Sequence, residues 1–170
     1  MKPQINLWII AAALAATNGL LFAAAENHRE SLRGLSAVTV RVERLSEEAR
    51  AGGLSEQALR AEVEQRLKAA GLKVLTPSEA AQTPGRPVLY VRVNARLPYS
   101  SDTYAVNVTL ALLQDVTAAR DPGLTIREAK TWDAGYLRTW PRQSLPQVMN
   151  TVRDLTDEFV GDWKLANSAR

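Results

Sequence analysis

From residue 88 to residue 116, apolar and polar residues alternate in two runs. The odd-numbered positions from Leu89 to Leu97 are apolar, and so are the even-numbered positions from Tyr104 to Leu112. A period of two places successive side chains on opposite faces of a strand, so both runs are predicted to be half-buried strands of an antiparallel sheet. Residues 98–102 between them are turn-forming. The rest of the chain is expected to cover the apolar face.

A third strand is predicted from Leu124 to about Arg138, after a tight turn at residues 121–123 (Asp-Pro-Gly). If the hairpin folds about Pro122, residues whose numbers sum to 244 face each other. Strands of this length exceed the usual five or six residues, so a bulge is expected in one of them. The predicted pairs are Leu112 with Trp132 and Val108 with Tyr136, all on the buried face.

The flanking segments predict helices and shorter strands. A strand is expected over residues 35–45, and a helix capped by Ser55 is expected to run to about Ala70. Residues 72–75 predict a short strand, followed by a turn or two of helix from a capping box at Thr76. A second capping box is predicted at Ser144. It opens a long helix whose apolar residues are Leu145, Val148, Met149, Val152, Leu155, Phe159, Val160 and Trp163.

The first 25 residues differ in kind from the rest of the chain. Residues 7–25 are almost wholly apolar and follow a short start that carries Lys2. This layout favours a cleaved signal peptide, and a retained membrane anchor is the alternative. Both alternatives place the remainder outside the cytoplasmic membrane, as an exported, periplasmic protein. The predicted organisation is residues 1–25 as this segment, 26–34 as a linker and 35–170 as a single domain.

Composition excludes several kinds of chemistry. The chain has no cysteine, which excludes disulfides, zinc–thiolate sites and cysteine nucleophiles. Its net charge of +3 is spread along most segments, so no nucleic-acid partner is expected. The only histidine, His28, lies at the presumed cleavage junction, and no nucleotide-binding, hydrolase or zinc-protease motif occurs. We therefore expect no cofactor and no catalytic metal.

Carboxylates offer two candidate sites that the spacing does not favour. Asp154, Asp157, Glu158 and Asp162 lie together on the last predicted helix, as a weak cation site or, more simply, a solvated acidic face. Glu128 and Asp133 could serve as a paired acid and base, but their numbering places them on opposite faces of one strand. An enzyme is therefore not expected.

The most informative surface is the sheet face opposite the apolar one. Arg and Tyr side chains beside small polar residues favour a protein partner there, with a solvated face as the alternative. In the series Trp132, Tyr136 and Trp140, the first two are expected in the core and Trp140 is the most able to reach a surface. The candidate partner-binding residues are Tyr90, Arg92, Asn94, Arg96, Asn107, Thr109, Thr131 and Trp140.

The order of elements resembles the N-terminal domain of TolB-like periplasmic proteins. The resemblance covers about a third of the chain, in residues 38–42 and in residues 67–74 (Leu-Lys-Ala-Ala-Gly-Leu-Lys-Val). It implies an accessory role in the cell envelope and transfers no functional residue. A similar outline occurs in other exported bacterial α+β domains.

Together these patterns predict an α+β domain with a mainly antiparallel sheet of about five strands, two principal helices on one face and a preceding N-terminal hydrophobic helix. The predicted function is a non-enzymatic accessory or interaction subunit of the bacterial cell envelope that docks on a membrane-bound or periplasmic assembly. The alternative is a periplasmic module that binds a small ligand between the sheet and residues 76–87. Membrane contact through residues 7–25 is expected if they are not cleaved.

Overall fold

The computed structural model describes residues 28–168, and the predictions made for residues 1–25 lie outside this range. Five strands form one sheet in the order β2-β1-β3-β4-β5. Within residues 28–168, no helix combines the length and apolar character needed to cross a bilayer. The strands are β1 (Ala37–Val42), β2 (Lys73–Val74), β3 (Val88–Arg96), β4 (Thr103–Ala118) and β5 (Asp121–Pro141). The helices are α2 (Glu47–Ala51), α3 (Glu56–Ala69), α4 (Pro77–Gln82), the 3-10 helix η1 (Arg142–Gln147) and α5 (Val148–Asn167).

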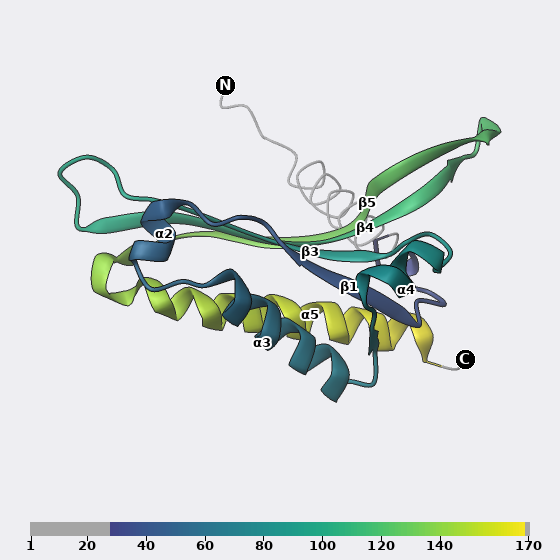
Figure 1. The fold of residues 1–170 in the computed structure, drawn as a ribbon, viewed down its shortest axis with the longest axis horizontal. Coiled ribbons are helices and arrows are strands. Elements are labelled where there is room, and N and C mark those ends of the chain that lie inside the picture. The colour runs from purple at the N-terminus through teal and green to yellow at the C-terminus, as the bar shows by residue number, and fades with distance from the viewer. Residues whose placement is uncertain (1–27, 169–170) are drawn as a thin grey trace, which may run out of the picture.

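The sheet is mixed and mostly antiparallel, which confirms the predicted α+β class. β1 pairs in parallel with both β2 and β3, whereas β3–β4 and β4–β5 are antiparallel. α3 and α5 both lie against one face of the sheet (Figure 1). The opposite face, which these helices do not cover, is called the open face below.

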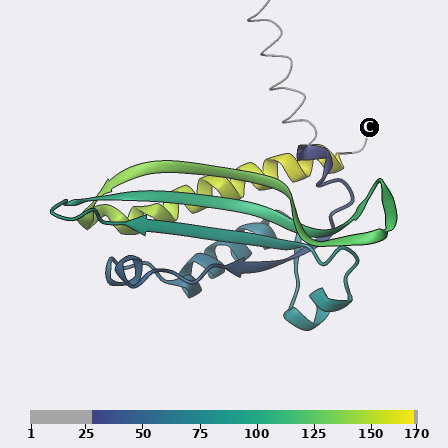
Figure 2. The same cartoon turned by 90° about the horizontal axis from the view of Figure 1, so that it is seen from above.

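The predicted register of the β4–β5 hairpin is confirmed for the two residue pairs named from the sequence. Leu112 pairs with Trp132, and Val108 pairs with Tyr136. Trp132 is buried as expected, but Tyr136 is 39% exposed, so its assignment to the core was wrong. The turn, however, is formed by residues 119–120, and residues 121–123 begin β5. Three register shifts along the hairpin absorb the difference, so the expected bulge is present in more than one place. The long hairpin runs the length of the molecule in Figure 2.

Local sequence signals set most of the helix boundaries. The Ser55 hydroxyl accepts the Ala58 N–H, and the Leu72 N–H donates to the Leu67 carbonyl beyond Gly71, whose φ of +91° suits glycine. Thr76 and Glu79 form the predicted capping box. Helix α2 was not predicted from the sequence, although Ser46 caps it through the Ala49 N–H at 3.1 Å.

The capping box predicted at Ser144 was wrong. Residues 142–147 form the 3-10 helix η1, which has no side-chain cap, and α5 begins only at Val148. The Leu145 side chain is fully buried, which draws this segment into the core. The apolar stripe of α5 nevertheless covers the sheet as expected: Val148, Val152, Leu155 and Phe159 are buried, and Met149, Val160 and Trp163 are partly buried against the same core.

The core joins the hairpin to α5. Trp132 on β5 meets Phe159 on α5 edge to face, with ring centroids 5.1 Å apart and an interplanar angle of 74°. The indole N–H of Trp132 donates to the Asp162 carboxylate at 3.0 Å, so its one polar atom is satisfied. Trp132 and Phe159 therefore lie on the same side of the sheet, as the predicted register requires.

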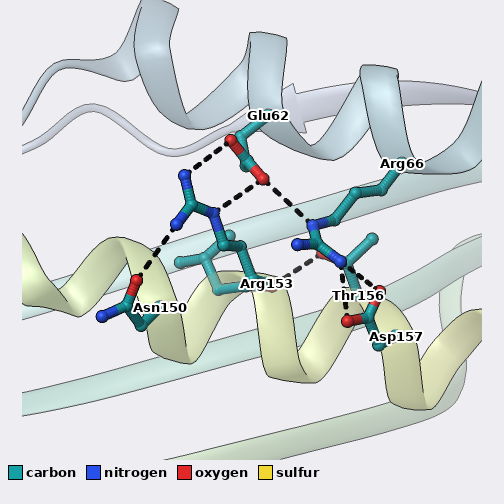
Figure 3. Close-up of polar contacts among 7 residues, drawn as sticks. Glu62, Arg66, Asn150, Arg153, Thr156 and Asp157 are labelled. Atoms are coloured by element: carbon teal, nitrogen blue, oxygen red, sulfur yellow. Dashed lines mark hydrogen bonds and ion pairs between the residues drawn. The ribbon is translucent and has the colours of Figure 1, made fainter.

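A network of hydrogen bonds and ion pairs connects α3 with α5 (Figure 3). Glu62 on α3 accepts from Arg153 on α5 at 2.8 Å and from Arg66 at 3.0 Å. Arg66 also binds the Asp157 carboxylate on α5. Hydrogen bonding from Arg153, followed by that from Arg66, lowers the pKa of Glu62, while partial burial opposes the change. The network therefore fixes α3 beside α5, with the Glu62 carboxylate between the two arginines.

Candidate functional site

The side chains of β3 that alternate with buried residues point away from the helices. Tyr90, Arg92, Asn94 and Arg96 alternate with buried neighbours along the strand. The β3–β4 register sets Arg92 beside Thr109 and Asn94 beside Asn107. Six of the predicted partner-binding residues therefore share the open face: Tyr90, Arg92, Asn94, Arg96, Asn107 and Thr109.

The structure places the other two predicted residues elsewhere. Lys130 pairs with Leu113 and Trp132 with Leu112, so the bulge leaves Thr131 outside the register. The Thr131 hydroxyl accepts from the Gln114 amide at 2.8 Å, and its carbonyl accepts from the Ser31 hydroxyl at 3.0 Å. Its assignment to the open face was wrong, because an inserted residue changes the alternation.

Trp140 lies opposite Tyr104, whose side chain is buried among the core residues. Trp140 is itself partly buried against this core. The register therefore puts it on the helix-covered face, and it is not part of the open face.

Leu113 is the last residue of β4 that pairs with β3, and it pairs on its other side with Lys130 of β5. From this pair, β4 and β5 continue as a two-stranded arm, residues 113–130. Figure 1 shows that the arm bends out of the sheet toward the side opposite the helices. Arg41 on β1 binds Glu128 at the base of the arm through two hydrogen bonds of 2.9 Å. β3 and β4 lie between β1 and β5 in the sheet, so this ion pair crosses the open face.

Between the arm and the open face lies a groove of about 700 Å³. We call it the open-face groove. Its lining comes from four strands and includes both partners of the crossing ion pair. The lining residues are Arg41, Val42, Glu43, Arg44, Tyr90, Arg92, Thr109, Ala111, Leu113, Glu128 and Lys130.

Tyr90 forms the centre of the groove floor, between two guanidinium groups. The Arg41 guanidinium carbon lies 5.2 Å from the ring centroid, and that of Arg92 lies 5.7 Å from it, within the range of cation–π attraction. Arg92 Nε donates to the Glu43 carboxylate at 2.5 Å. Hydrogen bonding to Glu128 raises the pKa of Arg41, and hydrogen bonding to Glu43 raises the pKa of Arg92. Both arginines are thus held in place and charged.

The base of the arm is fixed by a second carboxylate, Asp115. It accepts from Arg86 Nε at 2.8 Å and from the Glu128 N–H at 3.1 Å. Burial alone raises the pKa of Asp115, but the hydrogen bonds from Arg86 and from the Glu128 N–H outweigh it and the pKa falls below its usual range. Glu128 has a φ of +50°, a conformation uncommon outside glycine. Contacts to both its backbone and its side chain hold it there.

The groove keeps an excess of positive charge after its internal pairs are counted. Four cations line it (Arg41, Arg44, Arg92 and Lys130) against two carboxylates (Glu43 and Glu128). Lys130 also pairs with Asp133 at 2.9 Å. Within residues 28–168, no ion pair is found for Arg44 or for Arg96. The surface is therefore mixed in charge with a modest positive surplus.

The two carboxylate sites considered from the sequence are occupied by intramolecular partners. Glu128 is bound by Arg41 and Asp133 by Lys130. On α5, Asp157 binds Arg66 and Asp162 binds Arg29. Within the described part of the chain, no group of three or more His, Cys, Asp or Glu side chains is placed to hold a metal ion.

The part of the groove contributed by β1 and the arm was not predicted from the sequence. Arg41 and Glu43 alternate with the buried Val40 and Val42, and this signal could have assigned them to the open face. No sequence pattern predicts the contact between Arg41 and Glu128, since this contact depends on how far the arm bends.

Two smaller hollows flank α4, where the alternative small-ligand site was predicted. One, of about 250 Å³, is lined by residues 33–37 together with Thr83, Pro84, Pro87 and Gln114. The other, of about 220 Å³, lies between α4 and the arm and includes Arg86 and Asp115. Both are open to solvent, so neither would enclose a ligand.

Comparisons with known proteins give no family. No protein-family model and no curated protein matches the chain. Among solved structures, the chain is similar to two forms of the PelC dodecamer from Paraburkholderia phytofirmans, one of them a variant with a single Leu-to-Met substitution. For the variant, identity is 17%, the TM-score is 0.44, and the match covers 77% of this chain and 89% of that one. For the other form, the values are 18%, 0.40, 75% and 86%.

A minor lipoprotein from Acinetobacter baumannii also matches, at 11% identity and a TM-score of 0.32, over 78% of this chain and 93% of that one. Likeness at this level does not define a shared function.

Proposed function

We propose that this protein is a non-enzymatic interaction subunit of the cell envelope that docks on a partner protein through its open face. The main observation in support is the open-face groove. In it, Arg92, Tyr90 and Arg41 form a preorganised stack beside small side chains. Arg and Tyr are among the residues most enriched in the energetically dominant parts of interfaces. Side chains already fixed by neighbours lose less entropy when a partner binds.

The absence of catalytic groupings in the sequence supports a binding role. The single histidine lies next to the apolar leader, and the carboxylates at the groove are bound by arginines. The leader, residues 7–25, supports export across or anchoring in the cytoplasmic membrane, and hence a place in the envelope.

Photo-crosslinking in the organism that makes the protein tests this proposal. A photoreactive residue is placed at Asn94 on the open face or at Gln57 on the exposed side of α3. We expect a discrete protein adduct from Asn94 and none from Gln57, with the adduct lost in a Thr109→Arg variant that obstructs the groove floor. Equal adducts at both positions, or none at Asn94, would overturn docking through this face.

The second candidate function is binding of a small ligand in the hollow beside α4, between residues 33–37 and residues 83–87, where a bound ligand would stay partly exposed. It predicts a compound that raises the melting temperature of the intact chain. It also predicts that a bulky substitution at Ser36 removes this effect while leaving the Asn94 adduct unchanged. The two functions are therefore separable by experiment.

A further inference from the structure

We propose that the open-face groove binds an acidic, extended polypeptide segment of the docking partner. This inference rests on the proposed function and names the chemistry of the partner. The supporting observations are the distribution of charge in the groove and the shape of its floor.

The arginines of the groove already bind carboxylates of the protein itself, and a carboxylate of a partner would offer them the same chemistry. Each of its two stacked arginines holds a carboxylate of the protein itself, Glu128 on Arg41 and Glu43 on Arg92. Arg92 binds Glu43 through Nε, and its guanidinium also contacts Tyr90, so only part of its donor capacity remains for another acceptor. A guanidinium can bind two acceptors at once because its five N–H groups form a fixed fork.

The charge count gives the sign of the ligand. The lining carries four cations against two carboxylates, and Lys130 is paired with Asp133 outside the lining. The surplus after pairing is therefore one charge, that of Arg44, which has no ion pair within residues 28–168. A ligand with a few negative charges would therefore be attracted. A highly charged polyanion such as a nucleic acid fits less well, because Glu43 and Glu128 would repel it and nucleic-acid sites carry a continuous basic stripe.

The form of the groove favours a chain over a compact ligand. It is open along the sheet, so a small molecule would remain largely exposed, whereas small-molecule sites bury most of their ligand. Thr109 makes a low, half-buried part of the floor beside Arg92, where a backbone can approach closely, whereas Ala111 is covered by its neighbours. Asn94 and Asn107 continue this track along the strands and offer amide groups to a peptide backbone.

Peptide binding to the intact protein tests the inference. The probe is a labelled ten-residue peptide with five Glu in a Gly-Ser background, and its partner has Gln in place of each Glu. Affinity is measured by fluorescence anisotropy at about 0.15 M salt, where the Debye length is about 8 Å. We expect the Glu peptide alone to bind, and the Arg44→Glu/Arg92→Gln variant to lose about fivefold or more in affinity, on the order of two exposed charge contacts.

Arg60→Glu provides the matched control. Arg60 is exposed on α3, on the helix side of the sheet, and this substitution changes the net charge by −2. Arg44→Glu alone also changes it by −2 and is the groove variant matched to this control, whereas the double groove variant changes it by −3. We expect its affinity for the Glu peptide to stay within about twofold of the unsubstituted protein, since charges beyond a Debye length are screened. Unchanged melting temperatures confirm that the variants are folded.

Several outcomes would overturn the acidic-segment inference. They are equal binding of the Glu and Gln peptides, no binding at about millimolar peptide, or equal losses in the groove variant and in Arg60→Glu. Tighter binding of a single-stranded oligonucleotide, or of anionic lipid vesicles, with the same dependence on Arg44 and Arg92 would replace the peptide by that class. If the Asn94 adduct persists in these cases, docking through the open face stands and only the partner chemistry fails.

Discussion

Arg41 and Glu128 are held together by two hydrogen bonds of 2.9 Å, although β3 and β4 separate their strands in the sheet. The pair connects the base of the arm to β1 and forms one side of the open-face groove. The backbone of Glu128 is fixed by its N–H, which donates to the Asp115 carboxylate. The shape of the candidate site thus depends on a contact between residues 87 positions apart.

Removing this ion pair should loosen the arm without unfolding the domain. Both side chains are about half exposed, so Arg41→Gln is expected to cost about 0.2–1 kcal/mol of global stability. Amide hydrogen exchange in residues 113–130 should rise about two- to fivefold while exchange in α5 stays unchanged. The exchanged pair Arg41→Glu/Glu128→Arg should restore part of the protection. Unaltered exchange in the arm of Arg41→Gln would show that other contacts hold it.

The contact between Trp132 and Phe159 should dominate the stability of the core. Phe159 is fully buried and Trp132 is 2% exposed. Phe159→Ala is expected to lower the free energy of unfolding by about 3–5 kcal/mol, through lost burial and the cavity left behind. The measurement is urea denaturation followed by circular dichroism. Leu165→Ala, on the same helix at 62% exposure, is the control and should change stability by no more than about 0.5 kcal/mol.

The interhelical network centred on Glu62 should show coupling between α3 and α5. The Glu62 side chain is 20% exposed and that of Arg153 is 41% exposed, so each contact contributes modestly. A double-mutant cycle with Glu62→Gln and Arg153→Gln should give a coupling energy of about 0.2–1 kcal/mol, reduced at high salt. A cycle between Glu62 and Arg142, which lies outside α5, serves as the reference and should give none.

Gly135 should resist substitution because of its close contact with β4. A Cβ added there would lie 2.9 Å from the Val108 carbonyl oxygen, and backbone atoms in a paired strand cannot move aside easily. Gly135→Ala is expected to cost about 1–3 kcal/mol in thermal or urea unfolding. Gly161→Ala on α5 meets nothing within 4 Å and should stabilise the helix by roughly 0.5–1 kcal/mol. Equal effects of the two substitutions would contradict this account.

Stability should fall in acid because several carboxylates are charged more readily in the folded state. The pKa of Glu79 is lowered from 4.5 to about 2, first by the Thr76 N–H and then by Lys73. The pKa values of Glu62 and Glu128 are also lowered, by their arginine partners. The stability these groups contribute is therefore complete above pH 4.5 and is lost as the pH falls toward about 2.

Urea midpoints measured at intervals between about pH 6 and pH 2 check this dependence. In Glu79→Gln, the decrease over this window should be smaller than in the unsubstituted protein, because one lowered pKa has been removed. Identical slopes for the two proteins would show that Glu79 titrates alike in the folded and unfolded chains.

Much of the fold could be predicted because its signals are local. Ser55 and Thr76 cap their helices through their own neighbours, and Gly71 ends α3 with a positive φ. The pairing of Leu112 with Trp132 followed from alternation, since a sheet face is decided by the parity of residue numbers. The same parity failed at Thr131, where a bulge of one residue reverses it.

The candidate site was predictable only in part, for the same reason. Alternation along β3 and β4 brought six predicted residues, including Arg92 and Asn107, onto one face. Whether a residue number is odd or even predicts which face of the sheet its side chain lies on. It does not predict which residues of distant strands come into contact. The ion pair between Arg41 and Glu128 could therefore not be predicted from the sequence.

The sequence by itself determined the α+β class, the buried face of the hairpin and most helix ends, because these follow from periodicity and capping within a few residues. Only the tertiary structure decided that the arm bends over the open face, that Arg41 meets Glu128 there, and that a groove with a positive surplus lies between them. Strand twist and bulges accumulate along the sixteen residues of β4, and small local rotations fix where its far end lies.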